Sequence, residues 1–229
     1  MRKFYKKADA TQSERGWTVT LDGRPLRTPA HAELVLPSEI MARAIASEWD
    51  AQGEMIDPVS MPFTGFANAA IDHVGASRDG FADGIAVYGE SDLLCYRAPE
   101  PDELVAHQCR LWDPLLDWAK GRYDIAIEMA EGVMHRPQPA PTLARLRGAL
   151  DAFDDFALAV AQPIVSVTGS LIITLALLEC EIDAQTAWTA GHADEDWQAE
   201  RWGRDSEAEA LAARQKKLLD DAAAFLALR

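Results

Sequence analysis

Near the N-terminus, apolar and polar residues alternate in a way that predicts a small antiparallel sheet. In WTVTLD, Trp17, Val19 and Leu21 fall on one face of a strand, and threonine and aspartate fall on the other. The following Asp22-Gly23 supplies the residues that a tight hairpin turn requires. The neighbouring segments RKFYKKA and ELVL suggest flanking strands. We therefore expect a sheet of three or four strands.

From Pro37 onward the apolar spacing becomes that of helices. Ser38 is a candidate N-cap for a helix whose apolar positions recur every three or four residues until Gly53. Asp113-Pro114 interrupts a later stripe, so two helices or one kinked helix both fit there. Asp183 can cap one helix, and Ser206 with Glu209 makes a capping box for the last one. Further helical patterns cover residues 63–74, 78–88, 143–157, 164–178, 183–202 and 206–225. The buried side of the last helix is expected to contain Leu211, Gln215, Leu218, Ala222 and Phe225.

The order of these elements predicts an α+β protein. A small antiparallel sheet with helices comes first, and a C-terminal helical orthogonal bundle follows. We place the N-terminal α+β domain at residues 1–98 and the helical domain at residues 99–229. Residues 92–98 and 124–130 look extended and could return to the first sheet, which would make the first domain discontinuous.

Charge and composition narrow the possible partners. The 229 residues carry a formal net charge of -15, which disfavours nucleic acids and anionic membranes and favours a basic partner. The longest apolar run, residues 164–178, is too short for a membrane span, so we expect no membrane insertion. Cys95, Cys109 and Cys180 are odd in number and form no CxxC pair, which fits buried, reduced thiols in a cytoplasm. No presequence is evident before Arg2.

Motifs for catalysis or metal binding are weak. The sequence has no GxSxG, GxGxxG or GxxxxGK[ST] pattern and no HExxH. His107 and Cys109 are two residues apart on one predicted helix and do not face each other. His192 and Glu195 could meet on a helix, but a third metal ligand is not nearby. We expect no metal and no cofactor, while a catalytic triad assembled from distant positions stays open.

The most acidic segment, DEDWQAERWGRDSEAE at residues 194–209, also holds two tryptophans. If residues 183–202 form one continuous helix, Trp188, Glu195 and Trp202 are seven residues apart and share one side. Two interpretations remain. Both tryptophans can be core anchors, with Glu195 meeting an internal arginine or a backbone amide. Alternatively, these groups form an exposed aromatic and acidic patch, a combination that protein interfaces favour.

Six sequence blocks together resemble a known family, the ATP synthase assembly chaperones that handle the alpha subunit of the catalytic head, of the mitochondrial assembly factor 2 type. Each block alone is of low specificity, but their order along residues 2 to 210 is shared with the family. The blocks are RKFYKKA, GWTVTLDGRPLRTP, LPSEIMARAIASEWDAQGEMIDPVSMPFTGFANAAID, SDLLCYRA, WDPLLDWA and DEDWQAERWGRDSEAE.

The resemblance implies a chaperone, not an enzyme. Such a protein binds the newly made alpha subunit, shields the surface meant for beta, and releases it during assembly. A bacterial member would act in the cytoplasm. The resemblance and the mixture of charge and large apolar groups single out Glu195, Gln198, Trp202 and Asp205 as partner-binding residues. The alternative is a hydrolase-type enzyme with a spatially assembled Cys/His/Asp site.

Five other residues in the matching blocks are candidates either for the core or for contact with the client. Asp92, Tyr96 and Arg97 either pair internally or contact the client. Trp112 and Trp118 are expected in the core, because their spacing matches an apolar helical stripe.

Overall fold

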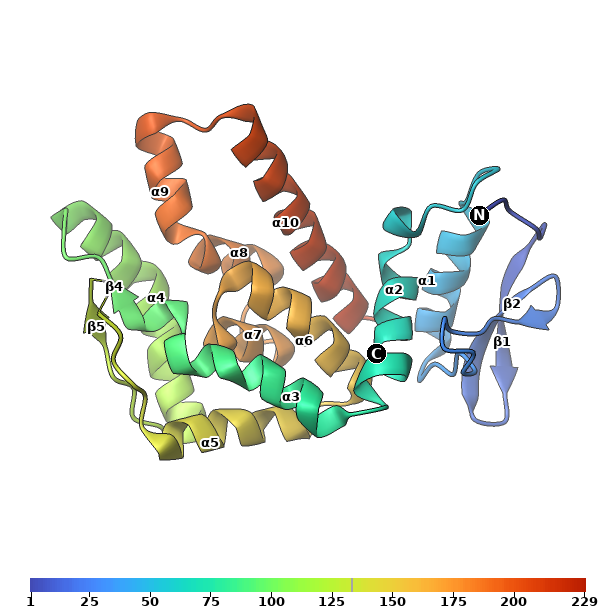
Figure 1. Ribbon diagram of the computed structural model, residues 1–229, viewed down its shortest axis with the longest axis horizontal. Helices are drawn as coiled ribbons and strands as arrows, with labels where there is room; N and C mark the ends of the chain where they lie inside the picture. Colours follow the sequence, from blue (N-terminus) through green and yellow to red (C-terminus); the bar gives the residue numbers. More distant parts are fainter. Residues whose placement is uncertain (133) are drawn as a thin grey trace. The chain divides into compact units, whose positions relative to one another are not determined.

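The N-terminal alternation forms a three-stranded antiparallel sheet in the computed structural model, which describes residues 1–132 and 134–229 (Figure 1). The strands are β1 (Ala8–Ser13), β2 (Gly16–Leu21) and β3 (Arg24–Pro25), in the order β1-β2-β3. Asp22 and Gly23 both have positive φ, 48° and 80°, which confirms the tight turn between β2 and β3. The ELVL segment adds an isolated bridge from Leu36 to Trp17.

Helix α1 (Glu39–Asp50) packs on this sheet. The Ser38 side chain accepts a hydrogen bond from the Met41 amide at 3.1 Å, so the predicted N-cap is confirmed. Met41, Ile45 and Trp49 are buried at helical spacing. After a 3₁₀ turn (Pro58–Ser60), α2 (Pro62–Ala69) continues into a π-helical turn (Ala70–Val74).

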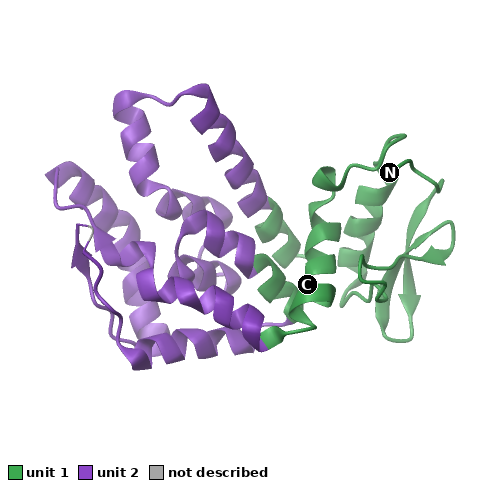
Figure 2. Cartoon of the chain, in the orientation of Figure 1, with its two compact units in different colours: residues 1–78, 155–160, 221–229 green, residues 79–154, 161–220 purple. Residues whose placement is uncertain are grey.

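The first compact unit contains residues 1–78, 155–160 and 221–229 (Figure 2). Its late segments belong to α6 (Asp155–Thr168) and α10 (Ser206–Leu226), which the unit boundary divides. Phe225 of α10 is fully buried, and its ring centroid lies 5.4 Å from that of Phe66 and 6.5 Å from that of Phe156. We predict that the chain divides at residue 98 into two domains, and this division stays a prediction.

The expectation that residues 92–98 and 124–130 return to the first sheet is wrong. β4 (Tyr96–Arg97) and β5 (Ala130–Glu131) pair with each other as a separate parallel ribbon. Residues Leu93–Cys95 form a 3₁₀ turn instead of a strand, because the Asp92 carboxylate accepts a hydrogen bond from the Leu94 amide at 3.1 Å.

The second compact unit, residues 79–154 and 161–220, is helical. Pro114 lies inside one helix, α4, so the two-helix alternative does not apply. The stripe over residues 143–157 is interrupted by a 3₁₀ turn (Leu150–Ala152) before α6 begins. A second 3₁₀ turn covers Val87–Ser91. The helices are α3 (Arg78–Ala86), α4 (Asp102–Tyr123), α5 (Ala140–Ala149), α7 (Leu171–Leu178), α8 (Ala184–Gly191) and α9 (Ala193–Trp202).

The apolar run at residues 164–178 forms parts of two helices, not the single helix expected. Gly169 has φ 65° and ends α6, and the Ser170 hydroxyl accepts the Ile173 amide at 3.0 Å to start α7. All eight residues of α7 are buried. Within the residues that the structure describes, no helix is long and apolar enough to cross a membrane.

Candidate functional site

The acidic segment forms α9, a turn and the start of α10. The expected continuous helix over residues 183–202 is wrong, because His192 leaves the helical conformation (φ -121°, ψ 22°) between α8 and α9. Gly203, with φ 77°, ends α9. Asp205 Oδ1 accepts the Ala208 amide at 2.8 Å, so Asp205 caps α10 in place of the predicted Ser206.

This break separates the two tryptophans that the sequence places on one side. Trp188 is buried, and its ring stacks on His192 with 3.5 Å between centroids. Trp202 is 74% exposed. The core interpretation therefore holds for Trp188, and the exposed-patch interpretation holds for Trp202.

All four predicted partner-binding residues lie around one hollow, which we call the Trp202 hollow. Each of the four side chains is exposed to solvent, and together they line a concave part of the surface. Three of them come from α9, and Asp205 comes from the turn that follows. The complete lining is Glu195, Gln198, Ala199, Trp202, Gly203, Arg204, Asp205 and Ala208.

The exposed Trp202 ring rests on a buried neighbour. Its edge contacts Trp197, with ring centroids 5.8 Å apart and an interplanar angle of 73°. Trp197 is buried and carries the Arg201 guanidinium 3.5 Å from its ring centroid. Trp202 is thus supported from one side while most of its surface remains in contact with solvent.

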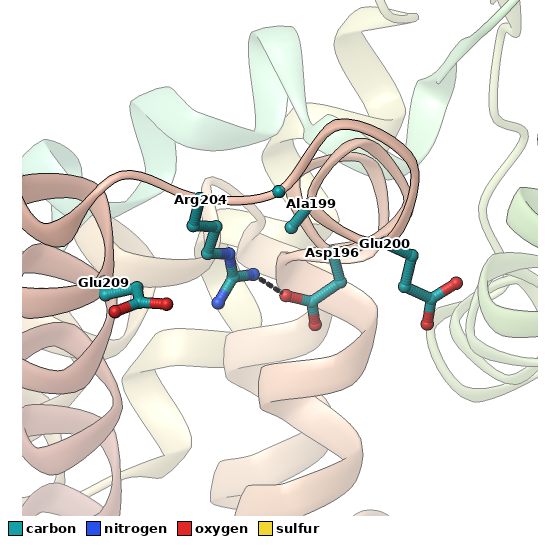
Figure 3. Close-up of a pocket in the computed structure, with 6 residues that line it drawn as sticks. Asp196, Ala199, Glu200, Arg204 and Glu209 are labelled. Carbon is teal, nitrogen blue, oxygen red and sulfur yellow. Dashed lines mark hydrogen bonds and ion pairs between the residues drawn. The ribbon is translucent and has the colours of Figure 1, made fainter.

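A second hollow adjoins the first and shares Ala199, Gly203 and Arg204 with it (Figure 3). Arg204 forms an ion pair with Asp196 across this hollow. Glu209 lies on the α10 side of it, whereas Glu200 points away from Arg204.

Most carboxylates of this region have no cation beside them. In the described part of the chain, Asp196 is the one acidic residue of this segment with an ion pair, and Asp194 accepts a hydrogen bond from Gln108. The acidic residues with neither an ion pair nor a hydrogen bond from another side chain are Glu195, Glu200, Asp205, Glu207 and Glu209. Their negative charge is therefore available to attract a basic partner.

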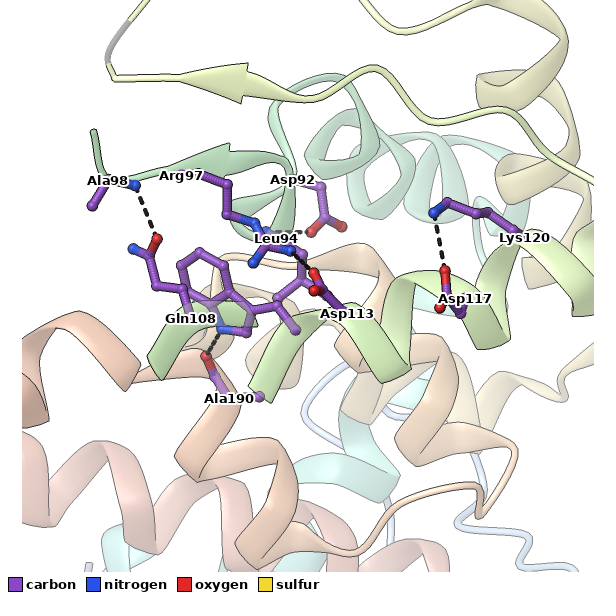
Figure 4. Close-up of polar contacts among 10 residues, drawn as sticks. Asp92, Leu94, Arg97, Ala98, Gln108, Asp113, Asp117, Lys120 and Ala190 are labelled. Carbon is purple, nitrogen blue, oxygen red and sulfur yellow. Dashed lines mark hydrogen bonds and ion pairs between the residues drawn. The ribbon is translucent and has the colours of Figure 1, made fainter. Parts of the chain in front are cut away.

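A cluster of polar side chains on α4 contacts three other segments of the chain, and Figure 4 shows the hydrogen bond between Gln108 and Ala98 and the one that the Ala190 carbonyl accepts. The Gln108 amide is buried, accepts from the Ala98 backbone amide and donates to Asp194 Oδ1 at 2.7 Å. Trp112, also buried, donates its indole hydrogen to the Ala190 carbonyl at 2.8 Å. The sequence analysis did not predict the role of Gln108. A polar side chain among the apolar positions of α4 was the feature that could have indicated it.

The same cluster answers the question about Arg97 and Asp92. Arg97 pairs with Asp113 at 2.6 Å and lies over the Trp112 ring. Asp92 is buried and also accepts the Ile172 amide at 2.9 Å. Tyr96 contacts His135 through its hydroxyl. All three pair internally. Trp112 is in the core as expected, and Trp118 is half-buried with its ring against Tyr123.

The groups that a hydrolase or metal site would need are not gathered here. The expectation of buried thiols is confirmed for Cys95 but is wrong for Cys180, which is exposed, while Cys109 is half-buried. Burial raises the pKa of the Cys95 thiol to about 12, so it stays protonated at neutral pH. His192 is buried beneath Trp188, whereas Glu195 is exposed. Across the residues that the structure describes, no cluster of three histidine, cysteine or acidic side chains could hold a metal ion.

The chain is similar to known proteins over much of its length. The family model described as ATP12 chaperone protein matches residues 2–120. Protein atp12, mitochondrial, from Schizosaccharomyces pombe is 24% identical over 215 residues, which cover 88% of this chain and 74% of that protein.

Two solved bacterial structures share the fold over nearly the whole chain. Atp12 from Paracoccus denitrificans is 44% identical, with a TM-score of 0.93 over 99% of this chain and 97% of that one. A protein from Agrobacterium tumefaciens is 43% identical, with a TM-score of 0.90 over 99% of this chain and 85% of that one. The chain therefore belongs to the ATP12 chaperone family, which confirms the resemblance drawn from the six sequence blocks.

Proposed function

We propose that this chaperone binds the unassembled alpha subunit of the F-type ATP synthase head through the Trp202 hollow and prevents its aggregation until alpha pairs with beta. The observation that carries the proposal is the arrangement of Glu195, Gln198, Trp202 and Asp205 around one hollow, with the Trp202 ring largely exposed. The family resemblance supplies the identity of the client.

The chemistry of this hollow suits a protein partner. A tryptophan offers about 200 Å² of rigid contact area, and truncation of such a residue at an interface often costs more than about 2 kcal/mol of binding energy. The unpaired Glu195 and Asp205 select a partner that presents lysine or arginine beside an apolar group. The net charge of -15 increases the rate of encounter with such a surface.

Binding alone is sufficient for the proposed activity. A subunit that awaits assembly exposes an apolar interface, and a protein that covers this interface competes with self-association by mass action. In this proposal the chaperone carries out no chemical step, uses no cofactor and acts in the cytoplasm of a bacterium. Release follows when the beta subunit offers the larger complementary surface.

Charge reversal at Glu195 tests the proposal. We expect Glu195→Lys to weaken capture of purified alpha subunit by roughly tenfold, because it places a cation where the partner presents one. The melting temperature should stay within about 1 °C of the wild-type value, since Glu195 is exposed and unpaired. Capture is measured by pull-down and by light scattering during dilution of unfolded alpha subunit.

Glu90→Lys is the matched control, because Glu90 is also exposed and has no ion pair among the described residues, but lies in the 3₁₀ turn after α3. It should leave capture unchanged. If the wild-type chaperone does not bind the alpha subunit, the proposed client is wrong. If Glu195→Lys and Glu90→Lys weaken capture equally, the overall charge acts and the Trp202 hollow does not.

A further inference from the structure

The first half of α10 is exposed in a way that the fold does not explain. The apolar stripe of this helix predicts a buried side from Leu211 to Phe225. Ala222 and Phe225 are fully buried as predicted, but Leu211 is 51% and Leu218 is 36% exposed. From residue 198 to residue 218, all of which the structure describes, no side chain is buried. The prediction is therefore wrong for the first half of the helix.

The exposed part of the stripe begins at the Trp202 hollow. Ala208, Leu211, Gln215 and Leu218 follow one another at intervals of three and four residues, so they lie on one face of α10. Ala208 lines the Trp202 hollow together with Trp202 itself. At a rise of about 1.5 Å per residue, the stripe extends the hollow by about 15 Å along the helix. The hollow and the stripe therefore meet at Ala208, and Trp202, Leu211 and Leu218 are the large exposed apolar side chains of the combined surface.

Charge divides this surface into two ends. Asp205, Glu207 and Glu209 lie at the end beside the hollow and have no ion pair in the described part of the chain. Further along the helix, the exposed Arg214 has no ion pair in the described part of the chain, and Lys216 pairs with Asp220 at 3.0 Å. A partner therefore meets uncompensated negative charge at the Trp202 end of the stripe.

We propose that the stripe Ala208, Leu211, Gln215 and Leu218 binds an amphipathic helix of the client, about three turns long, with lysine or arginine at its end beside Trp202. Helices bind such surfaces through side chains spaced three and four residues apart, and Ala208, Leu211, Gln215 and Leu218 follow one another at these intervals. This inference rests on the proposed function, since it names the second half of the same binding surface.

A second copy of the chaperone is a poorer occupant of the stripe. Two copies each carry a net charge of -15 and would bring the same unpaired carboxylates near each other. A basic client segment removes this repulsion and covers the leucines at once.

The test replaces the two exposed leucines by serine. We expect Leu211→Ser combined with Leu218→Ser to weaken capture of purified alpha subunit at least tenfold at a temperature where circular dichroism shows that the variant is folded. The melting temperature should fall by only a few degrees, because serine has a lower helix propensity than leucine and Leu218 is partly buried. Leu211→Met combined with Leu218→Met should retain capture, because methionine keeps the apolar contact. Val87→Ser is the matched control, since Val87 is an exposed aliphatic residue of the same unit outside this surface.

A photo-crosslinking amino acid at position 218 identifies the occupant. It should label a segment of the alpha subunit whose apolar residues recur at helical spacing and whose one end is basic. Labelling of a second chaperone copy, or of an extended segment, overturns the inference.

The serine variants also separate this inference from the proposed function. If the wild-type chaperone binds the alpha subunit and the double serine variant binds it equally well, the α10 stripe is not part of the surface, but the Trp202 hollow stands. If the wild-type chaperone does not bind the alpha subunit, the proposed function fails first.

Discussion

Helix α7 and the segment of residues 198–218 both carry large apolar side chains, but they use them differently. Every residue of α7 is buried, whereas none of residues 198–218 is, all of them within the described part of the chain. Apolar area contributes to folding only when folding removes it from water. The leucines of α7 therefore stabilise the protein, whereas Trp202 and Leu211 contribute much less to stability, and Leu218, 36% exposed, contributes an intermediate amount. The exposed apolar area of these three residues becomes useful only when a partner covers it.

The largest predicted effect is the difference in the free energy of unfolding between a leucine truncated in α7 and a leucine truncated in the first half of α10. Leu175→Ala should lower the free energy of unfolding by about 2 to 5 kcal/mol, because it opens a cavity in a fully buried site. Leu211→Ala should change it by less than about 0.5 kcal/mol. Urea unfolding monitored by circular dichroism measures both. A loss above about 2 kcal/mol for Leu211→Ala would show that α10 is supported along its first half.

A buried carboxylate next to α7 makes stability depend on pH. Asp92 is fully buried, and desolvation raises its pKa to about 6, although the Ile172 and Leu94 amides partly offset this by hydrogen bonding to the carboxylate. In the unfolded chain the pKa is about 3.9, so the folded state binds the proton more tightly. The contribution of Asp92 to the free energy of unfolding is therefore largest below pH 4 and falls as pH rises to about 6.

The contribution of Asp92 to the free energy of unfolding should decrease by about 3 kcal/mol, because the pKa differs by about 2 units between the two states and each unit corresponds to about 1.36 kcal/mol. Urea unfolding at several pH values from 4 to 7, compared between the wild-type protein and Asp92→Asn, isolates it. The free energy of unfolding of the wild-type protein should fall relative to that of Asp92→Asn as pH rises from 4 to about 6, since the variant cannot titrate at this position. A difference that is constant with pH would mean that Asp92 is ionised throughout.

Local sequence signals predicted the parts of the fold that depend on a few neighbouring residues. The Asp22-Gly23 turn and the Ser38 and Asp183 caps are confirmed, because each is decided within about four residues. The break at His192 was missed, since the helical spacing continues through it and the break accompanies stacking of His192 on Trp188. The β4–β5 pairing joins segments that are more than thirty residues apart, which no local pattern reveals.

The candidate site shows the same division. The acidic block singled out Glu195, Gln198, Trp202 and Asp205, and the structure places all four at one hollow. Their role in binding the client stays a prediction. The stripe of α10 was recognised as apolar, but periodicity alone does not say whether the protein itself or a partner covers Leu211 and Leu218.

A smaller decrease in the free energy of unfolding is expected when a side chain is added where α8 contacts α6. A Cβ atom added at Gly191 would lie 3.0 Å from Thr168 Cα, which is too close for the two backbones as they stand. Gly191→Ala should therefore lower the free energy of unfolding by about 1 to 3 kcal/mol. Gly148→Ala is the control, because a Cβ at Gly148 in α5 meets no atom within 4 Å, and it should raise stability by about 0.5 kcal/mol. Thermal unfolding of the pair distinguishes packing at α8 from a general effect of alanine.

The smallest effect on stability should come from the most exposed tryptophan. Trp202→Ala should change the free energy of unfolding by less than about 0.5 kcal/mol, since Trp202 loses little area on folding beyond its edge contact with Trp197. Trp112→Ala, in a fully buried position of α4, should cost about 3 to 5 kcal/mol. The same two proteins should reverse their order in capture of the alpha subunit under conditions where both are folded. If Trp202→Ala lowered the free energy of unfolding about as much as Trp112→Ala, Trp202 would belong to the core. Its side chain would then not be available to bind a partner.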